Sequence, residues 1–83
     1  EEEIKIKFTG RAVRKAKENN YHSTQELEEI NEDEVIVTIN TCSFNEVKEW
    51  VLGFGADAEV LKPKRLREEV KEEVDKLQEV YGV

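Results

Sequence analysis

The stretch WVLGFGADAEVL, residues 50–61, decides how the chain divides into helices and strands. Four apolar residues in and before it share one face of a helix: Phe44, Val47, Val51 and Phe54. Gly55 follows directly, and glycine can adopt the left-handed backbone conformation that ends many helices. We therefore expect a helix that ends at Gly55 and a short strand over residues 58–61.

Upstream of this junction, the N-terminal region predicts a strand followed by a helix. Ile4, Ile6 and Phe8 alternate with polar residues, which is the period of a half-buried strand. Residues 11–19 then have the period of a helix. Small apolar residues lie on one side of this helix and cations on the other: Ala12, Val13 and Ala16 against Arg11, Arg14 and Lys15.

The middle of the chain predicts a hairpin and the start of a second helix. Residues 24–30 break the strand alternation and carry glutamates, so we expect an irregular edge strand there. Residues 31–34 are polar and short, as in a hairpin turn. Residues 35–40 are rich in β-branched side chains and predict a central strand. Ser43 and Glu46 have the spacing of a capping box, which would begin the helix that runs to Gly55.

The C-terminal region predicts a third, longer helix. Pro63 ends the strand before it and suits a first helical turn. Glu72 and Lys76 have the spacing of a favourable ion pair. An apolar stripe runs the length of this helix: Leu66, Val70, Val74, Leu77 and Tyr81. A stripe of that length needs a cover, so we expect it to pack on the sheet, on a neighbouring helix or on another chain.

The order β-α-β-β-α-β with an added helix predicts an α+β, ferredoxin-like fold. We expect one domain over residues 1–83, with a four-stranded antiparallel sheet, two helices on one face and the C-terminal helix as an addition. The chain has 83 residues, starts at Glu1 and contains no methionine, which indicates a segment of a larger protein. No apolar run approaches the roughly 20 residues of a membrane span, so we expect a cytoplasmic protein with no membrane partner.

Composition and residue types give little support for an enzyme. His22 is the only histidine and Cys42 the only cysteine, so neither a Ser/His/Asp relay nor a disulfide is indicated, and Cys42 is expected to be a small buried thiol. The chain lacks a zinc ligand set and a glycine-rich phosphate loop, and its many acids show no sign of a paired-carboxylate site. We predict no catalytic residue, metal or cofactor.

The net charge of −7 argues against a surface that attracts nucleic acid or lipid everywhere, yet the cations are clustered. The run over residues 11–25 combines a basic helix face with a polar loop, and arginine supplies forked donors for phosphate while a ring can stack on a base. The alternative is that Tyr21 anchors the loop in the core and the arginines are solvated. Trp50 lies at the edge of its helix's apolar arc, which places it either in the core or at an interface, and we favour the core.

These segments together resemble the C-terminal extension domain, called the WCX domain, of WYL-domain transcriptional regulators. The similarity rests on a strand ending in an aromatic residue, an Ala- and Arg-rich helix, an aromatic-His loop ending in Gln, a Trp-Val-Leu helix end and a Pro-initiated Leu-Arg-Glu helix. Here these are Phe8, residues 12–17, residues 21–25, residues 50–55 and residues 63–68. The chain departs from the family pattern in the loop, where Ser23-Thr24 replaces Pro-Ser and Tyr21 replaces Trp, at Gly53, which replaces Ser, and in the hairpin, which lacks Asp-Gly.

The resemblance implies a bacterial regulator in which another domain binds operator DNA and this one contributes to dimerisation and effector sensing. It implies a homodimer formed through the parent protein and an anionic effector, such as a single-stranded nucleic acid. Carried onto this sequence, the candidate effector contacts are Arg11, Arg14, His22 and Gln25. Two other classes stay open: a free-standing ferredoxin-like module that binds small ligands, and a small phosphohydrolase, for which no arginine loop is evident.

Overall fold

The computed structural model describes residues 2–19 and 22–82. Seven main elements follow the predicted order, with a short 3-10 turn, η1, before the last strand. They are β1 (Glu2–Thr9), α1 (Arg11–Glu18), β2 (Glu26–Asn31), β3 (Glu34–Thr41), α2 (Phe44–Leu52), η1 (Gly55–Asp57), β4 (Ala58–Lys62) and α3 (Lys64–Tyr81). No helix within the described residues is long and apolar enough to cross a membrane.

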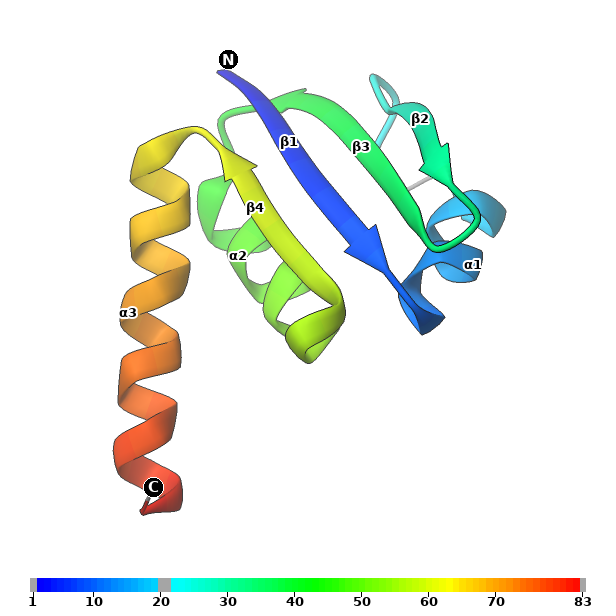
Figure 1. Ribbon diagram of the computed structural model, residues 1–83. Helices are drawn as coiled ribbons and strands as arrows, with labels where there is room; N and C mark the ends of the chain where they lie inside the picture. Colours follow the sequence, from blue (N-terminus) through cyan, green and yellow to red (C-terminus); the bar gives the residue numbers. More distant parts are fainter. Residues whose placement is uncertain (1, 20–21, 83) are drawn as a thin grey trace.

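The four strands form one sheet in the order β2-β3-β1-β4, and each neighbouring pair is antiparallel. Figure 1 shows α1 and α2 on the same face of this sheet, with α3 standing beside β4. This is the ferredoxin-like arrangement that the sequence predicts. β2 is an edge strand whose register shifts between Glu29 and Asn31, so the expected irregularity of this segment is confirmed.

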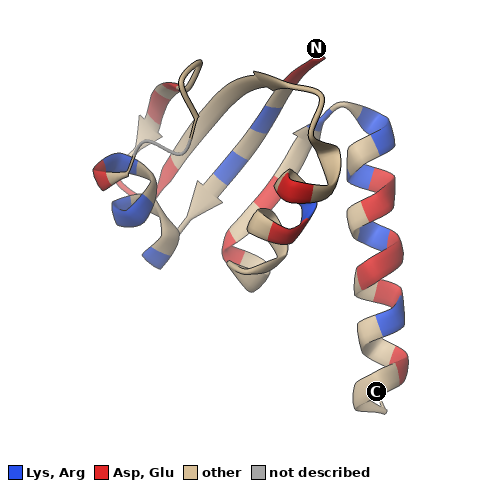
Figure 2. Cartoon of the chain, turned by 180° about the vertical axis from the view of Figure 1, so that it is seen from behind, with Lys and Arg blue, Asp and Glu red and all other residues tan. Residues whose placement is uncertain are grey.

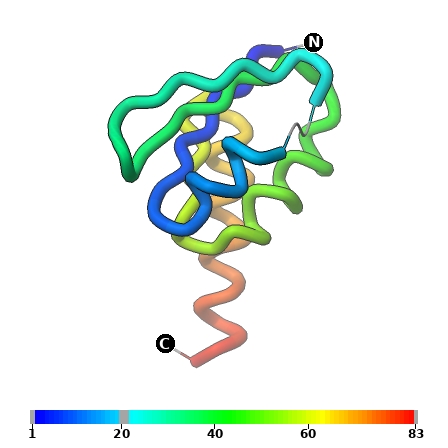
Figure 3. The backbone as a smooth tube through the Cα atoms, turned by 90° about the vertical axis from the view of Figure 1, so that its right-hand side faces the viewer, coloured from blue at the N-terminus to red at the C-terminus, as the bar shows by residue number. Residues whose placement is uncertain are grey.

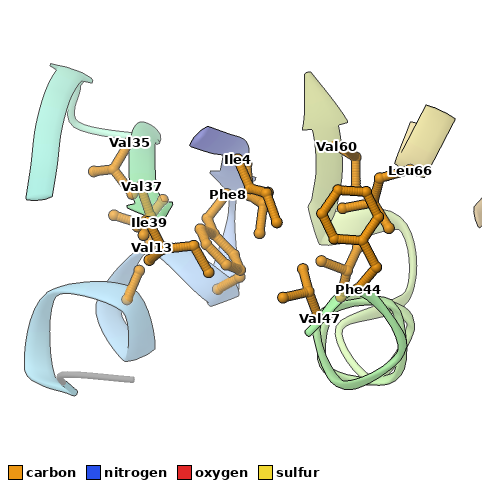
Figure 4. Packing of buried hydrophobic residues seen from close by; sticks show 14 residues of the cluster. Ile4, Phe8, Val13, Val35, Val37, Ile39, Phe44, Val47, Val60 and Leu66 are labelled. Carbon is orange, nitrogen blue, oxygen red and sulfur yellow. The ribbon is translucent and has the colours of Figure 1, made fainter. Parts of the chain in front are cut away.

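The core lies between the sheet and its two covering helices, as the strand alternation predicts. Ile6 of β1 pairs with Val37 of β3 and with Val60 of β4, which places one apolar row across three strands. Figure 4 shows these rows meeting the inward residues of the helices. The helices contribute Ala12, Val13, Ala16, Phe44, Val47, Val51 and Leu66. Trp50 is half-buried at the edge of the core and packs on Phe8 and Phe54, with ring centroids 5.5 and 6.1 Å from its own, so the expected core position is met in part.

The second helix begins and ends differently from the prediction. Ser43 is the N-cap residue, but its side chain makes no capping hydrogen bond. Instead, the Ser43 backbone N–H donates to the hydroxyl of Thr41 at 3.0 Å, because Thr41 is buried at the end of β3. The helix ends at Leu52 and not at Gly55. Gly55 does have the left-handed conformation, with φ of 61°, but it uses it to start the turn that leads into β4.

Two further expectations about single residues are wrong. Cys42 is exposed, because inward residues of β3 have odd numbers up to Thr41 and the next residue therefore turns outward. Lys76 pairs with Glu73, one helical turn away at 3.6 Å, and not with the predicted Glu72. Tyr21, which was offered as a core anchor of the loop, lies outside the described residues.

α3 packs on the domain only through its first turns. Leu66 is fully buried and Val70 packs partly against the core, while the rest of the predicted stripe is exposed. Arg65 stacks over the Phe44 ring at 4.6 Å, and Arg67 donates to the carbonyl of Val60 at 2.8 Å, so the base of the helix is fastened to α2 and β4. In the side view of Figure 3, the C-terminal half of α3 extends beyond the body of the domain.

Candidate functional site

Arg11 and Arg14, the two predicted arginines, lie on the outward side of α1. The helix packs on the sheet through alanines and a valine, which bring its backbone close and leave its long side chains in solvent. Figure 2 shows basic residues covering α1, while acidic residues prevail on the exposed side of α2. The two helices that cover the sheet therefore present faces of opposite charge.

The cations of α1 differ in how they are engaged. Arg14 Nε donates to Glu18 at 3.0 Å, and the Arg14 side chain is still 85% exposed. Lys17 pairs with Glu29 of β2 at 3.2 Å. Within the described residues, no carboxylate lies within ion-pair distance of Arg11 or Lys15. Exposed pairs contribute only about 0–1 kcal/mol, so an incoming phosphate could displace Glu18 from Arg14 at small cost.

Beside these cations is a shallow hollow of about 480 Å³ between α1 and the β2–β3 turn. Arg14 and Lys17 line it together with Glu18 and Glu32. Two cations and two carboxylates give the hollow no net charge. Any attraction for an anion therefore comes from the geometry of the arginine fork and from Arg11 and Lys15 on the same helix, which pair with no carboxylate among the described residues, and it should weaken as salt is added.

His22 and Gln25 lie in the connection between α1 and β2, and both are engaged with the backbone. The Thr24 backbone N–H donates to His22 Nδ1 at 3.1 Å, which leaves Nε2 to carry the ring proton in the neutral form. The Gln25 side chain donates to the Asn19 carbonyl at 3.2 Å, and its backbone N–H donates to the His22 carbonyl at 3.0 Å. Gln25 thereby ties the end of α1 to the start of β2.

The four predicted residues do not share one pocket. His22 lines a cleft of about 200 Å³ at the end of β3, whereas Arg14 lines the hollow beside the hairpin turn, and the two linings have no residue in common. The cleft at His22 also contains Ser43 and Glu46, from the failed capping box, and Trp50. The sequence reasoning missed these as site residues, although three polar residues in a row at the end of a strand, Thr41 to Ser43, could have drawn attention to that place.

The open face of the sheet is less suited to a nucleic acid than α1. Proteins that read single strands on such a sheet stack bases on exposed aromatic rings. Here Phe8 points to the covered side and is fully buried. Lys7 faces the open side, but it lies between Glu34 and Glu59, at 3.5 and 3.9 Å. These neighbours neutralise Lys7, and Lys5 donates to the hydroxyl of Thr38 at 3.3 Å. Among the described residues, the open face therefore carries no exposed aromatic ring on these strands.

The described residues contain no group of three or more His, Cys, Asp or Glu side chains that could hold a metal ion. Among the described carboxyls, that of Glu3 has a clearly shifted pKa, which a hydrogen bond from Lys62 and the charge of that lysine hold below its ordinary value. Glu3 and Lys62 form an exposed pair between the start of β1 and the end of β4. The pair fastens two elements together and lines none of the hollows near α1.

Fold and surface define a class of protein: a ferredoxin-like α+β domain with a basic outer helix and an added C-terminal helix. A family model described as the WCX domain matches residues 1–78, and the chain belongs to that family. WCX domains are regulatory domains associated with WYL regulators and are not known as catalytic, so the chain is a regulatory domain of this kind. No match to a curated protein was found for the chain.

Proposed function

We propose that the chain is the C-terminal regulatory domain of a bacterial WYL-type transcriptional regulator. In this role it contributes to dimerisation and to sensing an anionic effector, a single-stranded nucleic acid, while another domain of the parent protein binds operator DNA. The observation that carries the proposal is the family match over residues 1–78, which spans every strand and most of α3. The parent protein acts in the cytoplasm, where its operator and effector are found.

The basic face of α1 is the surface we assign to the effector. Residues 11–18 carry four cations and one acid, in a chain whose net charge is −7. Phosphates of a single strand would therefore be drawn to α1 and repelled by most of the remaining surface. His22 and Gln25 lie in the connection from α1 to β2, so we assign their loop as a second contact for a strand long enough to pass beyond α1.

A second candidate function is a free-standing module that binds a small ligand, and the cleft at His22 favours it. The cleft combines the His22 and Trp50 rings with the polar groups of Ser43 and Glu46. Its volume of about 200 Å³ is below the roughly 300–1,000 Å³ of typical ligand pockets. The cleft could therefore enclose one ring of a larger molecule, which makes this the weaker candidate.

The test replaces Arg11 and Arg14 by alanine in the parent protein and measures binding of a single-stranded oligonucleotide at several salt concentrations. Loss of two phosphate contacts should weaken binding and reduce the slope of log K against log salt by about 1.4. Both side chains are exposed, so the change should leave the fold intact. Replacing Lys48 on α2 and Lys62 at the end of β4 by alanine removes the same charge elsewhere and is the matched control.

A second variant separates charge from geometry. Arg11→Lys with Arg14→Lys keeps both charges but removes the forked donors that grip a phosphate. We expect affinity between that of the original and the alanine variant, with the salt slope nearly unchanged. An alanine variant that binds with the original affinity and slope, or a control that weakens binding equally, would refute the assignment of α1 to the effector.

A further inference from the structure

The apolar stripe of α3 passes from buried to exposed along the helix. Leu66 is fully buried, Val74 and Leu77 are 42% and 45% exposed, and Val80 and Tyr81 are 73% and 77% exposed. The stripe therefore extends past the part of the domain that covers its first residues, and Figure 1 shows the helix projecting there. Four large apolar side chains on one projecting helix are more than scattered surface residues and indicate a contact surface.

A groove of about 500 Å³ lies between α3 and the edge strand β4. Its lining includes the apolar Val60, Val70 and Val74 and the basic Lys64, Arg67 and Lys71. Two glutamates also line it, and one of them, Glu59, is held by Arg67 at 2.7 Å. The groove thus offers apolar contacts with a surplus of positive charge.

The charges of α3 are divided between its two halves. Residues 64–71 carry four basic and two acidic side chains, for a net charge of +2. Residues 72–81 carry four acidic side chains and one basic one, for a net charge of −3. The exposed apolar residues thus lie in the acidic half, while the groove is lined mainly by the basic half.

We propose that α3 is the dimer helix, and that two copies of the chain pair their α3 helices antiparallel. The acidic, apolar C-terminal half of each helix lies in the basic groove of the other. This inference rests on the dimerisation assigned above and names the surface and the partner: a second copy of the same helix. With a two-fold axis near Glu72, the middle of α3, each helix fills the groove of the other. Such a self-complementary contact is typical of a symmetric dimer.

The charge pattern selects the antiparallel orientation. In a parallel pair, the two basic halves would lie side by side, and so would the two acidic halves. In the antiparallel pair, each basic half lies opposite an acidic half. The helix dipoles add in the same direction, since each positive N-terminus then lies beside a negative C-terminus.

Cysteine crosslinking of the first and last residues of α3 tests the orientation directly. The variants are Lys64→Cys and Tyr81→Cys, each with Cys42→Ser so that no other thiol is present. The 18 residues of α3 span about 27 Å. In the antiparallel dimer, a cysteine at either end is far from its own copy but close to the cysteine at the opposite end. Mild oxidation should link a mixture of the two variants and neither variant alone.

The other outcomes each overturn part of the inference. Crosslinking of each variant with itself would show a parallel pair. A dimer in sedimentation equilibrium with no crosslink in any mixture would show that another surface pairs, which leaves dimerisation standing and removes α3. A monomer at high micromolar concentration would remove self-association through this chain, while effector binding by the parent protein would stand or fall on its own experiment.

Charge reversal provides a second test that does not depend on thiol geometry. Glu72→Lys with Glu79→Lys makes both halves of α3 positive, and both residues are exposed. The dimer dissociation constant should rise about tenfold, as the loss of several exposed ion pairs predicts. Adding Lys64→Glu and Lys71→Glu restores opposite charges and should recover most of the affinity. If the fourfold variant is as weak as the double variant, the antiparallel pairing is wrong.

Discussion

α1 and α3 lie toward opposite edges of one sheet and differ in how much of their apolar side the domain buries. α1 is short and buries all of its apolar residues, which are small, so that only polar and charged side chains remain outside. α3 is more than twice as long and buries fully only Leu66, at its base. The side chains that a helix leaves exposed indicate the kind of partner it can bind. α1 exposes cations, which suit an anion, and α3 exposes a hydrophobic stripe, which suits another apolar surface.

The largest effect should come from the one fully buried side chain of α3. Leu66→Ala removes a residue with no exposed surface and should lower the free energy of unfolding by about 2–5 kcal/mol, from lost burial and a cavity. Leu77→Ala, on the same stripe but 45% exposed, should change it by no more than about 0.5 kcal/mol in dilute protein. Urea denaturation measures both. Equal costs would show that the two halves of α3 are covered alike.

The same pair of variants also distinguishes packing within one chain from pairing between chains. Stability that depends on a dimer rises with protein concentration. The urea midpoint of the original chain should therefore rise with concentration, and Leu77→Ala should reduce that rise. A midpoint that is independent of concentration in both proteins would leave the projecting half of α3 without a role in folding.

A smaller effect is expected from enlarging a side chain beneath α1. Ala16 is 1% exposed and lets the helix lie close to the sheet, so Ala16→Leu should cost about 1–3 kcal/mol through overpacking. Lys15→Leu, one residue earlier and on the exposed side, should stay within about 0.5 kcal/mol. Urea denaturation of both variants measures the difference in the free energy of unfolding. A tolerated leucine at position 16 would mean that small residues are not what sets the closeness of α1.

The difference between these helices was partly readable from the sequence. Strand alternation is local, so Ile4, Ile6 and Phe8 were placed on the covered face correctly, and the element order then gave the ferredoxin-like sheet. The small apolar face of α1 was equally plain. The predicted capping box failed because it depends on residues outside the helix. The Thr41 hydroxyl accepts the Ser43 backbone N–H that Glu46 would have bound. The sequence pattern does not show this, because it follows from where β3 ends.

The candidate site shows the same limit. The sequence indicates that Arg11 and Arg14 face solvent, because their helix has only one apolar side. It does not indicate that the following loop carries His22 into a cleft with Trp50, more than 25 residues away in the chain. The sequence predicts the apolar stripe along α3, but only the structure shows at which residue the domain stops covering that stripe.

The smallest predicted effect concerns the exposed pair of Glu3 and Lys62, which joins the start of β1 to the end of β4 beside the base of α3. A hydrogen bond from Lys62 and its positive charge lower the pKa of Glu3 in the folded protein, so the carboxylate stabilises the fold above its ordinary pKa. That contribution is lost as the pH falls through the lowered folded pKa. Lys62→Met should therefore make stability fall less steeply between about pH 5 and pH 3, whereas Lys48→Met on α2 should leave the profile unchanged. Urea midpoints measured across that range test this. If Lys62→Met leaves the acid profile as steep as before, the Glu3–Lys62 pair adds nothing measurable to stability, and β1 and β4 are held together by strand pairing and packing alone.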